Sequence, residues 1–336
     1  MPILTGRQQI AIKSEATAGT AETLAAANVV LTTGAAEWSP EVAMTPRSAM
    51  TASLSPRGSV VGSQSAKISF KMFIRPNFTS GTAVTTTATE GDFSVPLKGC
   101  GVTVAYSAGG GSPNEFATYT PSSSHVVDET SGVYSTVALY EDGKVYKIHG
   151  AVGNCVLTFN VGQPVLAEFE FTGCFNAPID GALLVPTYSN VVEPAFLSAA
   201  LSVFGSGGAY TAAKISSLKF DLGNTIAMRP YPNTATGFFT AQITGRNPKG
   251  SFDPEEALAA TFNPFAAWIA GTTGGITTGV FPSTGTNYST MNFTVAKASY
   301  TKVGLADRDG VASAPVEFEA QATLAAGEDE WSLVCT

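Results

Sequence analysis

The sequence predicts a mainly β fold, with a minor helical part, built as two tandem domains. Three observations carry this prediction. Short segments alternate between apolar and polar residues, which is the period of a half-buried strand. Turn-forming residues are abundant, with 34 glycines and 19 prolines in 336 residues. Finally, several motifs return in the same order in the second half of the chain.

The clearest strand pair consists of the runs Cys155–Asn160 and Leu166–Thr172. A short connection that contains Gly162 and Pro164 separates them. In the second run, phenylalanines alternate with glutamates. This pattern predicts an antiparallel pair with an apolar inner face and an acidic outer face. The related run Pro315–Ala320 returns near the end of the chain.

The N-terminal part is expected to begin with an arm that holds one strand, Arg7–Lys13. For Ala21–Ala27 a loop is favoured over a short helix. A further strand opens at Glu37, and a long connection rich in Ser and Pro then runs through Gln64. The segment Ala66–Ile74 alternates cleanly and predicts a strand.

A hairpin is predicted where the runs Ser135–Tyr140 and Val145–His149 meet across an Asp-Gly turn. The short apolar piece Val95–Gly101 predicts a truncated helix. The polar segments 77–92 and 107–114 predict loops.

The second half is expected to repeat this order after a proline-containing linker. We predict a first domain at residues 1–180, a linker at 181–198 and a second domain at 199–336. The expected elements of the second domain are strands at Ala199–Phe204 and Ile215–Leu222, a helix at Phe262–Ala270, a loop at Gly271–Ser289, and strands at Met291–Val303 and Pro315–Ala322.

Two short motifs support the duplication. The segment Ile226–Pro230 matches Val42–Pro46, with Ala and Met at the same two positions. Some twenty residues later in each half, Lys249–Phe252 matches Lys67–Phe70. Because the matches keep the same order in both halves, they favour two copies of one unit.

Composition argues against several classes of function. The net charge is −8, whereas binding to a phosphate backbone needs clustered Lys and Arg. The four cysteines form no CxxC pair and are expected to be buried free thiols. His, Cys and carboxylates do not cluster at the spacing of metal ligands, so neither a metal nor a cofactor is expected.

No catalytic constellation stands out either. His125 lies near Asp128 and Glu129, but in a Ser-rich segment without a nucleophile elbow, so a solvated loop is the favoured interpretation. His149 lies within an alternating strand and is expected to be structural. Glutamates two residues apart on one strand share a face without a cleft between them. We therefore expect that the protein is not an enzyme.

The segment KVYKIHGAVGN (Lys144–Asn154), the strand CVLTFN, the Gly-Gln-Pro turn and the strand AEFEFTG together resemble the major tail tube proteins of long-tailed, siphovirus-type bacteriophages. The N-terminal arm and the strand opening at Glu37-Trp38-Ser39-Pro40 also fit, so the resemblance covers most of the chain.

The resemblance implies a structural virion protein whose two tandem domains are each a tail-tube-like β-sandwich or half-barrel with a short flanking helix. In this family, inner sheets join between subunits into a barrel around a channel, and rings stack into a tube that conducts DNA and the tape measure protein. Tail terminator and baseplate proteins would be further partners, without membrane insertion. Assembly would occur in the bacterial host cytoplasm. The simplest members carry one domain and form hexamers; a duplicated chain would give a trimeric ring with pseudo-sixfold symmetry, with a hexamer as the alternative.

The resemblance also suggests roles for particular residues. An acidic channel would repel DNA phosphates, and ordinary outer solvent is the alternative surrounding for the same face. Lys67 and Lys71 are expected to offset part of its charge by cross-strand pairing. The candidate lumen residues are Glu168, Glu170, Glu317 and Glu319. The candidate inter-ring loops, Thr45–Gln64 and Arg229–Lys249, contribute Thr45, Arg47, Arg57, Gln64, Arg229, Arg246 and Lys249.

Two other functions remain open at this stage. A β-rich virion adhesin or decoration protein that binds a host surface glycan would show an exposed aromatic patch or a ligand groove. A β-sandwich carbohydrate hydrolase would need two carboxylates from different strands that face each other across a cleft.

Overall fold

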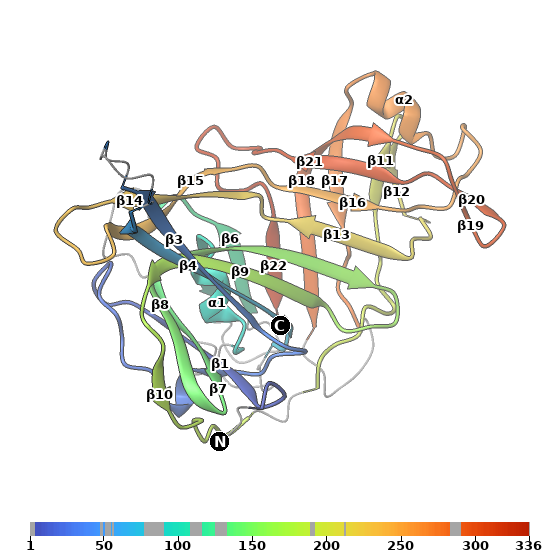
Figure 1. The fold of residues 1–336 in the computed structure, drawn as a ribbon. Helices are drawn as coiled ribbons and strands as arrows, with labels where there is room; N and C mark the ends of the chain where they lie inside the picture. The colour runs from blue at the N-terminus through green and yellow to red at the C-terminus, as the bar shows by residue number, and fades with distance from the viewer. Residues whose placement is uncertain are drawn as a thin grey trace.

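The computed structural model describes residues 4–47, 50, 55, 57–76, 91–107, 116–124, 133–188, 192–211, 213–282 and 290–335. Strands make up 54% of the structure, and two short α-helices make up most of the remaining regular structure. This confirms the predicted mainly β class. Large antiparallel sheets dominate the ribbon (Figure 1).

The last strand of the first half, residues 1–180, is β10, which extends one residue past residue 180. The elements up to that strand are β1 (Gln8–Ser14), η1 (Ala26–Asn28), β2 (Val29–Val30), β3 (Glu37–Pro46), β4 (Ser59–Phe73), α1 (Ser94–Lys98), β5 (Val102–Ser107), β6 (Phe116–Pro121), β7 (Ser135–Glu141), β8 (Gly143–Asn160), β9 (Leu166–Phe175) and β10 (Ile179–Gly181). The elements of the second half, residues 199–336, are β11 (Val203–Gly205), β12 (Gly208–Tyr210), β13 (Ser217–Asp221), β14 (Asn224–Pro230), β15 (Phe238–Arg246), β16 (Lys249–Phe252), α2 (Pro264–Ile269), β17 (Thr273–Thr277), β18 (Met291–Val303), β19 (Ala306–Arg308), β20 (Val311–Ser313), β21 (Val316–Ala320) and β22 (Ser332–Cys335).

One continuous sheet crosses both halves. Strands β3, β4, β9 and β8 of the first half are joined through β13 to β16, β21 and β18 of the second half. Except in the outer parts of β3 and β4, apolar side chains point to one face of these strands and polar side chains to the other, as period-two alternation requires. We call these eight strands the inner sheet and their solvent-facing side the polar face.

The main core lies on the other side of the inner sheet and takes residues from both halves. Phe171 and Phe318, from the two glutamate-containing strands, are both fully buried in it. Phe196, in the predicted linker, is also buried and stacks edge-on against Phe159 and Phe281. The linker is therefore packed against the body at this point. The predicted division into domains stays a prediction.

The two halves contain a matched three-strand ladder. In the first half β9 lies between β4 and β8, and in the second half β21 lies between β16 and β18. The register also matches, because Ser69 faces Glu170 just as Ser251 faces Glu317. The Lys-x-Ser-Phe motifs noticed in the sequence thus occupy equivalent places in the sheet.

The predicted hairpin across Asp142 and Gly143 is confirmed by the pairing of β7 with β8. The expectation that β8 consists of two separate runs is wrong. A bulge between His149 and Val152 interrupts the register, but Gly150, with a φ of +55°, bends the strand without ending it. The result is a strand of 18 residues.

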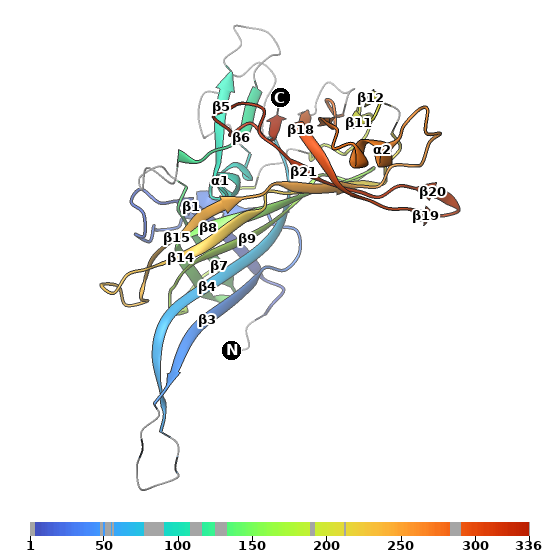
Figure 2. The ribbon, with the colours of Figure 1, turned by 90° about the horizontal axis from the view of Figure 1, so that it is seen from above.

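The polar connection predicted through Gln64 is also corrected, since most of its described residues belong to strands. β3 and β4 form a long hairpin that runs out of the body as a two-stranded ribbon (Figure 2). We call its outer part, residues 41–47 and 57–64, the arm. Both faces of the arm are exposed, with Met44 58% and Val61 54% accessible. Because neither face is buried, the sequence has no alternation there.

Other elements follow the predictions in part. The two predicted helices are present as α1 and α2. The strand β17 occupies part of the predicted loop after residue 271, and β5, β6 and β22 were not predicted. β22 lies between β18 and β6, so the C-terminal strand pairs with strands of both halves.

Candidate functional site

The polar face brings the four predicted lumen glutamates onto one side of the inner sheet. Glu170 forms an ion pair with Lys67 at 2.7 Å, and Glu168 forms one with Lys71 at 2.5 Å. The expected cross-strand pairing is therefore present. In the second half, Glu317 pairs with Lys302 at 2.9 Å. Rows of lysines and glutamates thus alternate across the face, which lowers its negative charge below what the glutamates alone suggest.

Glu319 is half-buried and faces Lys249 across the β16–β21 ladder. Whether this face lines a channel stays a prediction.

A shallow cleft of about 620 Å³ lies where the β14 strand passes over the polar face. Lys67, Glu170 and Asn154 line its floor, and Ile226 and Met228 line its side. Its aromatic residues, Phe70 and Phe169, are each 2% exposed, so they offer no ring surface to a ligand.

The predicted inter-ring residues fall into two groups. Thr45, Arg47 and Arg57 are exposed on the arm. Arg229 and Arg246, of the second group, belong to a hairpin, β14–β15, that folds back over the first half of its own chain. Arg229 there lies over the Phe239 ring at 5.2 Å.

Contacts within the chain also hold the remaining members of this set. The Arg246 guanidinium donates to the Ser122 carbonyl, at 3.2 Å, and lies 3.4 Å from Glu330. The Gln64 N–H donates to the carbonyl of Thr236 at the tip of the β14–β15 hairpin. Lys249 lies in the inner sheet, between Asp221 and Glu319. An inter-ring role for these residues stays a prediction.

The β14–β15 hairpin sits on a small apolar cluster that sequence reasoning missed. Ala18, Tyr134 and Val152, from three separate segments of the first half, pack against Ile243 and its neighbours. The Tyr134 hydroxyl also donates to the Gln242 side chain at 2.7 Å. No local pattern could have indicated this cluster, because its members lie far apart in the sequence.

Within the inner sheet, the joint between the halves is the ladder of β8 and β13. Asp221 faces Val156 and Lys219 faces Thr158 in an antiparallel register. Beyond the ladder, the side-chain amide of Asn224 donates to the carbonyl oxygens of Cys100, at 2.7 Å, and Gly153, at 2.9 Å. The halves are thus joined by backbone pairing and by an amide clamp.

The inner sheet has two outer edges. Among the described residues, β3 has no ladder partner besides β4. At the other end, β17 covers residues 294–299 of β18, but the chain beyond them leads into β19, which forms a separate two-stranded sheet with β20 and has no other ladder partner in the described structure. These edges lie at opposite ends of the inner sheet, with the β19–β20 hairpin on the right of Figure 1 and the arm pointing away from it in Figure 2. Such edges offer unpaired backbone N–H and C=O groups to another strand.

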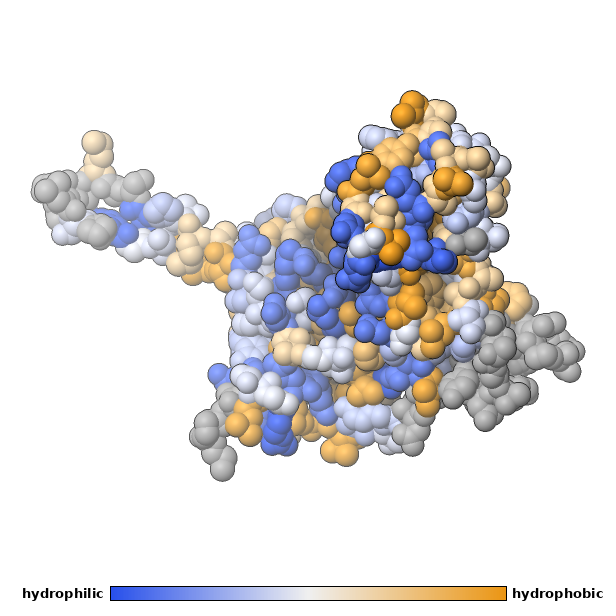
Figure 3. Space-filling view, turned by 90° about the vertical axis from the view of Figure 1, so that its right-hand side faces the viewer, coloured by the Kyte–Doolittle hydropathy of each residue, from blue (hydrophilic) through white to orange (hydrophobic). Residues whose placement is uncertain are grey.

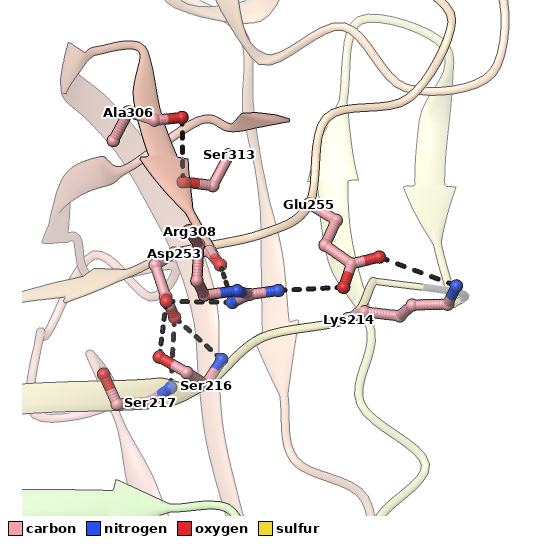
Figure 4. A network of polar contacts seen from close by, with 8 residues as sticks. All are labelled: Lys214, Ser216, Ser217, Asp253, Glu255, Ala306, Arg308 and Ser313. Atoms are coloured by element: carbon pink, nitrogen blue, oxygen red, sulfur yellow. Dashed lines mark hydrogen bonds and ion pairs between the residues drawn. The ribbon is translucent and has the colours of Figure 1, made fainter. Parts of the chain in front are cut away.

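A polar network fixes the edge formed by the β19–β20 hairpin (Figure 4). Arg308 donates to the Asp253 carboxylate and to Glu255, both at 3.0 Å. Asp253 also accepts hydrogen bonds from Ser216 and Ser217. Burial by itself would raise the pKa of Asp253. The hydrogen bonds outweigh this effect and hold the pKa of Asp253 below its ordinary value. In Figure 3, hydrophilic side chains gather where this hairpin points toward the viewer.

A buried carboxylate secures the N-terminal segment. Glu15 is 4% exposed and accepts hydrogen bonds from the N–H groups of Gly19 and Gly150 and from the Thr136 hydroxyl. Burial raises the pKa of Glu15 despite these donors. The Glu15 carboxylate joins three segments of the first half. Glu15 is not among the residues that line the cleft on the polar face.

The structure gives little support for a chemical role of the cysteines and histidines. All four cysteines are free and buried, as predicted. His125, Asp128 and Glu129 lie outside the described residues. His149 lies in β8, and burial lowers its pKa. The described part of the chain has no cluster of three His, Cys, Asp or Glu residues that could hold a metal ion.

Within the described ranges, no helix is long and apolar enough to cross a membrane. No protein-family model and no curated protein matches the sequence. The interpretation of function therefore depends on the residues and the geometry of this chain.

Proposed function

We propose that this protein is a structural virion subunit that assembles into rings, which stack into a tail tube around a central channel for DNA. One observation carries the proposal. The inner sheet is already joined once inside the chain, at β8–β13. In the described part of the chain, the outer edge of β3 and the edge that runs from the end of β18 into β19 have no ladder partner on their outer sides, and they correspond to the two edges of that joint. Repeating the same joint between copies would continue the sheet from chain to chain.

Continuation of one sheet by the same joint favours a closed ring. A heterologous contact whose rotation closes gives a ring, and one that does not close gives an open filament. A chain that contains two matched ladders contributes two units, so three copies would give a pseudo-sixfold ring, with a hexamer as the alternative. In such a ring the polar face would line the channel.

The polar face suits passage without binding. Three of its lysines pair with glutamates, in Lys67–Glu170, Lys71–Glu168 and Lys302–Glu317. Lysines that are paired in this way are less available to hold DNA phosphates, which suits a conduit. The exposed arm, with Val42 and Met44 on its surface, is a further surface that would be covered on assembly.

The alternative is a β-rich adhesin or decoration protein that binds a glycan. The cleft on the polar face provides the groove that this alternative requires, but its aromatic residues are buried under the sheet. A carbohydrate hydrolase would use carboxylates such as Glu168 and Glu170, which lie on one strand and are each held by a lysine. The absence of enzymatic activity remains an expectation.

Negative-stain electron microscopy of concentrated, purified protein tests the proposal. Hollow stacked rings, with rotational averaging of end-on views to give the symmetry, are the expected result. Closed particles without a channel would overturn it. A glycan array on the same preparation tests the alternative, which predicts saturable binding that is lost when Asn154 and Lys67, both in the cleft floor, are replaced by Ala.

A further inference from the structure

The joint inside the chain predicts the register of the joint between chains. β13 and β3 occupy equivalent places, because Asp221 faces Lys249 as Ser39 faces Lys67. Two residues earlier, Lys219 faces Ser251 as Glu37 faces Ser69. Strand β13 therefore shows where β3 would lie if its free edge met an equivalent partner.

The partner edge is defined in the same way. β8 pairs with β9 through Asn154 and Glu170, and β18 pairs with β21 through Lys302 and Glu317. Lys302 is thus the counterpart of Asn154. Counting along both strands makes Gly304 the counterpart of Val156. The edge at residues 304–308, which includes β19, is then the counterpart of the β8 edge that holds β13. β17 covers only the earlier residues 294–299 of β18.

If the contact between two copies repeats the β8–β13 joint, these equivalences determine which residues of the two copies face each other. Inside the chain Asp221 faces Val156, so Ser39 of one copy would face Gly304 of another. Two residues further along β3, Glu41 would then face Lys302. Both side chains lie on the polar face, since Glu41 lines the same cleft as Lys67 and Lys302 forms an ion pair with Glu317. Directly opposed residues have Cβ atoms about 5 Å apart, which is within reach of an ion pair.

From this register we infer that the edge of β3 docks on the β18–β19 edge of a second copy of this chain, and that Glu41 pairs with Lys302 across the contact. The charges are complementary at this position, and Lys302 is exposed enough to bridge two carboxylates, its side chain being 67% accessible. The inference rests on the proposed function for its biological context, but the contact itself can be tested separately.

Arg308 would prepare this edge for docking. It ties the β19–β20 hairpin to Asp253 and Glu255, so the edge strand is held in place in the isolated chain. A preorganised edge loses less conformational freedom on association than a loose one.

Charge reversal tests the pairing. Glu41→Lys and Lys302→Glu should each raise the concentration needed for half-assembly about tenfold, measured by sedimentation velocity at low salt, because each puts like charges opposite one another. Combining the two reversals should restore assembly to within about threefold of the wild type. Glu170→Lys is the matched control, since it also breaks a cross-strand pair with a lysine, but on an interior strand. It should leave assembly unchanged to within about threefold.

Cysteine cross-linking tests the register even where association is weak. Ser39→Cys protein mixed with Gly304→Cys protein should form disulfide-linked dimers on mild oxidation, because opposed Cα atoms fall in the range a disulfide requires. A Cβ at Gly304 would lie 3.6 Å from Pro315, an ordinary contact. Ser39→Cys mixed with Asp180→Cys should give at most background dimers.

The outcomes separate the two ideas. Cross-linked dimers without tubes in the microscope would support this contact and count against the tube. Tubes formed equally well by the wild type and by both single reversals, without cross-linking, would leave the tube standing and overturn this contact. Failure of the double reversal to recover, with each variant folded by circular dichroism, would also overturn the pairing.

Discussion

Asn224 offers the sharpest test of how the two halves are joined. Its side-chain amide donates to the carbonyl oxygens of Cys100 and Gly153, at 2.7 and 2.9 Å, and its backbone N–H donates to the Asn154 side chain at 3.0 Å. Asn224→Asp keeps the size and shape but replaces the NH2 group with an oxygen. That oxygen would then lie against two carbonyl oxygens.

The expected loss of stability can be worked from these contacts. A hydrogen bond contributes about 0.5–1.5 kcal/mol net, and leaving its buried partner unsatisfied adds to the cost. With two bonds lost at a half-buried site, the free energy of unfolding of Asn224→Asp should fall by about 2–4 kcal/mol at pH 7. Urea denaturation followed by circular dichroism measures it. Asn233→Asp is the matched control, because Asn233 is exposed and bonds only Tyr231; its change should stay within about 0.5 kcal/mol.

The pH dependence of the same variant supplies a second check. An aspartate between two carbonyl oxygens is harder to ionise, so its folded-state pKa should rise above the ordinary value of about 3.9. Because this carboxyl pKa is raised, the loss in free energy of unfolding relative to the wild type is greatest above the folded-state pKa. The loss shrinks as the pH falls through that pKa. A variant as stable as the wild type at pH 7 would refute the assignment of the amide clamp.

Three further predictions concern the sheet and its polar contacts. Gly250→Val should unfold the β13–β16–β21 ladder, because a Cβ there would lie 2.5 Å from a phenylalanine ring, while Gly245→Val, with nothing nearer than 3.9 Å, should fold; soluble yield and circular dichroism report both. Burial raises the pKa of Glu15, so thermal melts should show wild-type stability rising relative to Glu15→Gln as the pH falls from about 7 toward 4.3. Arg308→Met should cost about 0.5–1 kcal/mol at pH 7. Because the pKa of Asp253 is lowered, this difference should be present above about pH 3.9 and vanish below it, as acid melts would show.

The strands that the sequence predicts well are those with one face in the core. In β9, Phe169 and Phe171 point inward while Glu168 and Glu170 point to solvent, so burial produces a pattern that can be read locally. The β7–β8 turn at Asp142 is predictable for a similar reason, because its positive φ favours a small set of residues.

The elements that the sequence does not predict depend on distant partners. β22 is placed by β18 and β6, which come from different halves, and nothing in its four residues indicates this. The arm lacks alternation because both of its faces are exposed. The two free edges of the candidate site are features of the sheet order, and Glu41 or Lys302 could not be singled out before that order was known.

The two matching hairpins show how one motif can have two environments. Met44 on the arm is 58% exposed, whereas Met228 in the β14–β15 hairpin packs against the cluster that contains Tyr134 and Val152. The second hairpin meets the first half of its own chain. The arm meets its own chain at its base, where the Gln64 N–H donates to Thr236, but among the described residues Met44 packs against no core cluster; in the proposed ring its neighbour would belong to another copy.

This difference predicts opposite responses to one substitution. Met228→Lys should lower the free energy of unfolding by about 1–2 kcal/mol in urea, because a half-buried thioether chain is replaced by an ammonium group that must reach solvent. Met44→Lys should change it by less than about 0.5 kcal/mol in the isolated chain, since the side chain is already exposed. It should instead weaken assembly, measured by sedimentation. Equal destabilisation of the isolated chain by both substitutions would mean that the arm folds back in solution as β14–β15 does, and that it is not free to meet another copy.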